Sequence, residues 1–74
     1  MEIGNKVIVK PKNAFLVEVF NGVPGKIVDE RIPNSHLAML SGISHWVVEF
    51  ENPIVVRGET ITECEFHEYE LELV

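Results

Sequence analysis

The 74-residue sequence has little of what builds disulfide frameworks, zinc sites or membrane helices. Its single cysteine, Cys64, excludes an intramolecular disulfide and a zinc finger built on several cysteines. No apolar run approaches the roughly 20 residues that a membrane helix needs. The first five residues lack the basic and apolar stretches of a secretory signal. We therefore expect a small cytoplasmic domain that makes no contact with a membrane.

Basic residues are also scarce, and the charge is unevenly distributed along the chain. Six Lys and Arg stand against twelve Asp and Glu, which gives a formal net charge of −6. Residues 1–37 hold five basic and four acidic residues (net +1), whereas residues 38–74 hold one basic and eight acidic residues (net −7). Such a field repels nucleic acid, so we expect no nucleic-acid partner. The one basic feature is the alternation of Lys6, Lys10 and Lys12 along the first predicted strand, which Lys26 is a candidate to join.

The hydrophobic pattern predicts a single all-β domain over residues 1–74 with short strands. The expected strands cover residues 6–10, 14–20, 26–32, 45–51, 60–66 and 70–73, with residues 54–56 as an additional hairpin arm. Asn21-Gly22 predicts the turn of a hairpin, because both residues tolerate positive φ. Trp46, Val48 and Phe50 share one face of the clearest strand and are expected in the core.

One segment, residues 34–42, predicts a short helix that Ser35 caps and Gly42 ends. The apolar side chains of this insertion cannot all point inward from one short turn: Leu37, Met39, Leu40 and Ile43. They predict either an interface for a partner or a lid over an open barrel end, and the sequence leaves both open. A second single turn is expected at His67-Glu68-Tyr69, before the last strand.

The order of these segments resembles the SH3-like barrel group, which includes KOW- and Tudor-type domains. The residues that carry the resemblance are Gly22-Val-Pro-Gly25-Lys-Ile-Val28, the Trp-Val-Val-Glu-Phe strand at 46–50, and the ending Phe66-x-x-Tyr-Glu-Leu-Glu-Leu73. The resemblance implies a small barrel of five to six strands, with a single 3₁₀ turn before a final strand that pairs with the first. In Tudor-type relatives several aromatic side chains form a cage for methylated cations. Tyr69 is the best candidate in this sequence for an exposed ring, and a cage would need at least two more rings beside it. The acidic composition and the long insertion at 33–44 depart from KOW domains, and in style the chain is similar to small proteins of phages and other mobile elements.

The residues that could carry chemistry do not form a recognisable catalytic or metal motif. His45 and His67 can meet across two strands, with Glu65 nearby, but no His-x-x-x-His or Cys-x-x-Cys spacing is present. Cys64 lies between Glu63 and Glu65, whose charges raise the pKa of its thiol and weaken it as a nucleophile. We therefore expect no metal, no cofactor and no enzymatic activity.

Three functions are left, in order of preference. The first is a non-catalytic protein-interaction module, with self-association through residues 36–43 as one form of it. The second is an acidic inhibitor or adaptor that docks on the basic surface of a nucleic-acid-binding protein. Its contacts would come from the C-terminal glutamates, which the alternation of the last strands predicts on a solvated face: Glu63, Glu65, Glu70 and Glu72. The third is a small enzyme or an accessory subunit.

Overall fold

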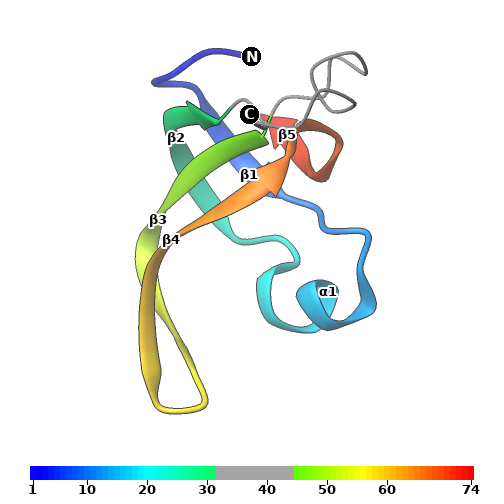
Figure 1. Cartoon of the computed structure of the whole chain (residues 1–74), viewed down its shortest axis with the longest axis vertical. Coiled ribbons are helices and arrows are strands. Elements are labelled where there is room, and N and C mark those ends of the chain that lie inside the picture. Colours follow the sequence, from blue (N-terminus) through cyan, green and yellow to red (C-terminus); the bar gives the residue numbers. More distant parts are fainter. Residues whose placement is uncertain (32–44) are drawn as a thin grey trace.

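The described part of the chain folds into one antiparallel sheet with one short α-helix. The computed structural model describes residues 1–31 and 45–74. Its elements are β1 (Lys6–Val9), α1 (Ala14–Phe20), β2 (Pro24–Arg31), β3 (His45–Val56), β4 (Glu59–His67), the 3₁₀ helix η1 (Glu68–Glu70) and β5 (Leu71–Leu73). The strand order in the sheet is β4-β3-β2-β1-β5 (Figure 1). The prediction of a mostly β chain is confirmed, and the predicted helix at 34–42 lies outside the described residues.

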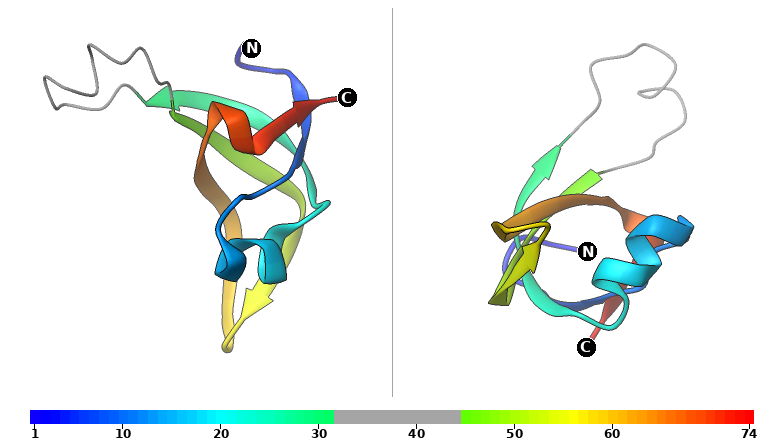
Figure 2. Two further views of the ribbon diagram at one scale, coloured as in Figure 1. Left: turned by 90° about the vertical axis from the view of Figure 1, so that its right-hand side faces the viewer. Right: turned by 90° about the horizontal axis from the view of Figure 1, so that it is seen from below.

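The sheet curls around its own inner face but does not close into the barrel that was predicted. Figure 2 shows β4 on one side of the curled sheet and β1 with β2 on the other. Within the described residues β4 pairs only with β3, and β5 pairs only with β1. The 3₁₀ helix η1 takes the chain from the end of β4 to β5, at the opposite edge of the sheet. The single turn expected at residues 67–69 is therefore confirmed, and a final strand does pair with the first.

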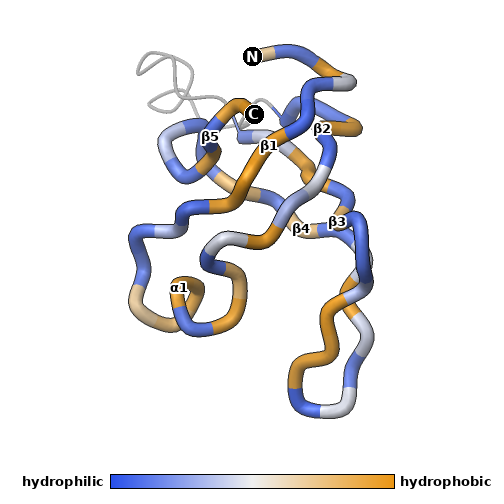
Figure 3. The backbone as a smooth tube through the Cα atoms, turned by 180° about the vertical axis from the view of Figure 1, so that it is seen from behind, coloured by the Kyte–Doolittle hydropathy of each residue, from blue (hydrophilic) through white to orange (hydrophobic). Residues whose placement is uncertain are grey.

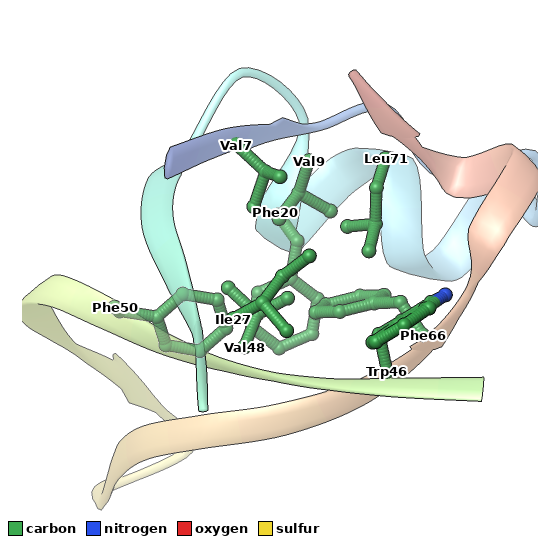
Figure 4. Packing of buried hydrophobic residues seen from close by; sticks show 9 residues of the cluster. All are labelled: Val7, Val9, Phe20, Ile27, Trp46, Val48, Phe50, Phe66 and Leu71. Atoms are coloured by element: carbon green, nitrogen blue, oxygen red, sulfur yellow. The ribbon is translucent and has the colours of Figure 1, made fainter. Parts of the chain in front are cut away.

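The inner face of the sheet holds one apolar core. Its buried side chains are Val7, Val9, Phe20, Ile27, Trp46, Val48, Phe50, Phe66 and Leu71 (Figure 4). The predicted core positions of Trp46, Val48 and Phe50 are thus confirmed. Phe20, from α1, stacks on Phe50 with ring centroids 5.4 Å apart and meets Phe66 edge-on at 5.6 Å. The helix therefore supplies an aromatic ring that the strands alone do not.

Residues 14–20 were predicted as a strand, and this was wrong because they form α1. The Asn13 side chain caps the helix by accepting hydrogen bonds from the backbone N–H of Phe15 (2.9 Å) and of Leu16 (3.4 Å). Leu16 and Phe20, four residues apart, lie on the helix side that packs against the core. Six of the seven residues in this segment are apolar, so they fit the period of two of a strand as well as the period of 3.6 of a helix. Hydrophobic periodicity therefore does not decide between a strand and a helix here. The N-cap Asn13 was the signal that the strand prediction ignored.

Asn21-Gly22 does not form the predicted hairpin turn. The backbone N–H of Asn21 donates to the carbonyl of Val17 and ends α1, while that of Gly22 donates to the carbonyl of Val9 at 2.8 Å. Gly22 has φ of +79°, so the expectation of positive φ holds there, but Asn21 has φ of −63°. The dipeptide thus returns the chain from α1 to β2 alongside the end of β1.

The hairpin of β3 and β4 extends beyond the body of the molecule as an arm (Figure 1). The strand expected at residues 45–51 and the arm expected at 54–56 form one strand, because β3 continues through Asn52-Pro53 with a register shift between Glu49 and Ile54. The turn at the tip, Arg57-Gly58, has φ of 51° and 81°, the combination of a type I′ hairpin. Figure 3 shows an apolar stretch along this arm, where Ile54 faces Ile61 and both pack against the core.

Candidate protein-binding surface

A row of four charged side chains crosses the outer face of the sheet. Lys6 on β1 lies opposite Lys26 on β2, Lys26 lies opposite Glu49 on β3, and Glu49 lies opposite Glu63 on β4. Register partners on neighbouring strands share one face of the sheet, and all four side chains are exposed. We call Lys6 and Lys26 the lysine pair, and Glu49 and Glu63 the glutamate pair. Lys26 thus joins the basic feature of the first strand.

Each pair places like charges directly opposite each other, an arrangement that destabilises a sheet. In the part of the chain that the structure describes, contacts of opposite charge within 4.0 Å are limited to Arg31–Asp29 and, where the imidazole is protonated, His45–Glu65. Neither the lysine pair nor the glutamate pair is therefore neutralised by a close contact with another described residue. The row therefore has a repulsive pair at each end and, between them, the opposite charges of Lys26 and Glu49, an arrangement that favours the sheet.

Glu65, a predicted site residue, is exposed but already has a partner. Its Oε1 lies 2.7 Å from Nδ1 of His45, and the rings of His45 and His67 meet edge-on with centroids 4.1 Å apart. The predicted meeting of the two histidines near Glu65 is confirmed. Glu65 differs from Glu49 and Glu63 in that its carboxylate already has a hydrogen-bond partner within the chain, the ring of His45.

Tyr69 is 60% exposed, and its ring stacks on His67 with centroids 5.1 Å apart and an angle of 10° between the planes. A cage for a methylated cation needs further aromatic rings beside it. Phe20, Phe50 and Phe66 are buried in the core and cannot line a surface site. The described residues therefore give Tyr69 a histidine neighbour rather than an aromatic cage.

Glu70 was predicted on a solvated face, and this was wrong because the side chain is only 5% exposed. One carboxylate oxygen, Oε1, accepts from the backbone N–H of His67 at 3.0 Å, and Oε2 accepts from that of Lys12 at 3.5 Å. The Glu70 carboxylate thus gives a hydrogen-bond acceptor to two backbone N–H groups, one at the start of η1 and one after β1. Alternation failed here because Glu70 belongs to η1 and not to the strand that follows it.

The four C-terminal glutamates therefore do not form one acidic face. Glu63 and Glu65 lie on β4, at one edge of the sheet, whereas Glu72 is exposed on β5, at the other edge, opposite Ile8. Glu70 lies inside. Sequence reasoning also missed Glu49, since its position beside Glu63 depends on the pairing of β3 with β4.

The other predicted contact residues belong to the insertion. Leu37, Met39, Leu40 and Ile43 lie outside the described residues, as does the whole segment 36–43. Exposed apolar side chains in the described part come from α1, the arm and the terminal segments: Ile3, Phe15, Val17, Val55, Leu73 and Val74.

Cys64 has the surroundings of a structural thiol. The side chain is half-buried and packs against the core. Burial is the main cause of a raised pKa at this thiol, and the negative charges of Glu65 and Glu70 raise the pKa further. The sequence predicted the direction of this pKa shift but attributed it to Glu63 and Glu65, whereas burial contributes most and the second charge is that of Glu70. A protonated thiol is a poor nucleophile and a poor metal ligand.

Within residues 1–31 and 45–74, no group of three or more His, Cys, Asp or Glu side chains is arranged to hold a metal ion. The helices of that same part are all too short or too polar to cross a bilayer. Comparison of the chain with protein-family models, with curated proteins and with solved structures finds no match.

Proposed function

We propose that this chain is a non-catalytic protein-interaction module that docks on a basic protein surface through the glutamate pair. The observation that carries the proposal is the position of Glu49 directly opposite Glu63, with both side chains exposed. Like charges in this arrangement lower the stability of a sheet. A partner that brings cations to the two carboxylates would remove that repulsion when it binds.

The ordinary explanation for an exposed glutamate on a sheet does not cover both members of the pair. Charged side chains on edge strands prevent sheets from pairing edge to edge, and Glu63 on β4 fits that role. Glu49 lies on β3, which has β2 on one side and β4 on the other, so it protects no edge. Its charge therefore protects no edge, and within its own chain it has only Lys26, which lies opposite it on β2, as a register partner of opposite charge.

The environments of the nucleophilic and basic side chains support a non-catalytic role. The pKa of Cys64 is raised, mainly by burial, and His45 is engaged by Glu65. The SH3-like assignment is part of the same proposal, and it is supported by the position of η1 directly before β5 and by the pairing of β5 with β1. A cytoplasmic location and self-association through residues 36–43 stay predictions.

The proposal is tested by affinity capture from an extract of the source cells with two matched variants. Glu49→Gln/Glu63→Gln removes the glutamate pair, and Glu2→Gln/Glu18→Gln removes two exposed glutamates elsewhere, so both change the net charge of −6 by the same amount. We expect mass spectrometry to find basic proteins that wild type and the second variant retain and the first variant loses, with capture that weakens at high salt. Equal capture by both variants would contradict the proposal.

A further inference from the structure

We draw no further inference here: the strongest candidate, the side-chain cluster of His45 and His67 where β3 and β4 meet η1, carries none, because Glu65 already binds the first ring and the part of the chain that the structure describes places no third His, Cys, Asp or Glu side chain in position to hold a metal ion with the two histidines.

Discussion

Two neighbouring residues of β3 show how differently the two faces of the sheet are built. Val48 points into the core and lies between Ile27 and Cys64, whereas Glu49 points outward and lies between Lys26 and Glu63. Every side chain in the first group gains from being buried beside the others. In the second group the contact between Glu49 and Glu63 is repulsive. The inner face therefore provides most of the stability, whereas the outer face combines the favourable pair of Lys26 and Glu49 with the repulsive pair of Glu49 and Glu63.

The strongest test of the inner face is Phe66→Ala. The ring of Phe66 is buried among Phe20 and Phe50, so its removal leaves a cavity that the surrounding strands fill only in part. We expect the free energy of unfolding to fall by about 3–5 kcal/mol, measured by urea denaturation. Val55→Ala is the control, because Val55 is an exposed apolar residue of the same hairpin and should cost less than about 0.5 kcal/mol. Similar losses for both variants would contradict the division between the faces.

Gly25→Ala tests how closely the inner face is packed. A Cβ atom at this position would lie 2.5 Å from Cγ1 of Val48 and 2.7 Å from the backbone oxygen of Glu49, so β2 and β3 would have to move apart. We expect a loss of about 1–3 kcal/mol in the free energy of unfolding. Lys26→Ala, one residue along on the outer face, should change stability much less. An unchanged melting temperature for Gly25→Ala would show that the two strands adapt more easily than the packing indicates.

Glu70→Gln tests the one glutamate of the C-terminal group that lies inside. The substitution weakens the hydrogen bonds that the carboxylate accepts from the backbone of His67 and Lys12, and places an amide donor near one of these groups. The expected loss of stability is about 1–2 kcal/mol, again by urea denaturation. Glu72→Gln removes an exposed charge two residues away and should leave stability nearly unchanged. Equal effects would mean that Glu70 is as solvated as the alternation of the last strand had predicted.

The smallest effect is expected on the outer face, and its sign is opposite. Glu63→Gln removes the repulsion with Glu49, so the free energy of unfolding should rise by about 0.2–1 kcal/mol in low salt and by less in high salt. Glu59→Gln, on the same strand but opposite Val56, provides the control. A destabilised Glu63→Gln protein would show that this carboxylate has a favourable contact within its own chain.

Local sequence signals decided most of the sheet. Alternation over residues 45–51 predicts which side chains of β3 face the core, because a strand has a period of two whatever its neighbours are. The turn at Arg57-Gly58 and the single turn at η1 likewise follow from residues that are adjacent in the chain. Where the local signal was ambiguous, as in the nearly all-apolar segment 14–20, the strand prediction was wrong and a helix formed instead.

Composition and local patterns establish an acidic, mostly β chain with a small aromatic core and no motif for catalysis. The buried position of Glu70 depends instead on tertiary contacts, since its carboxylate accepts hydrogen bonds from the backbone at the start of η1 and from that of Lys12, which is far away in the sequence. The tertiary structure also decided that Lys6, Lys26, Glu49 and Glu63 form one row. Strand order and register bring together residues that are up to 57 positions apart, from Lys6 to Glu63, and short-range patterns carry no information about such pairings.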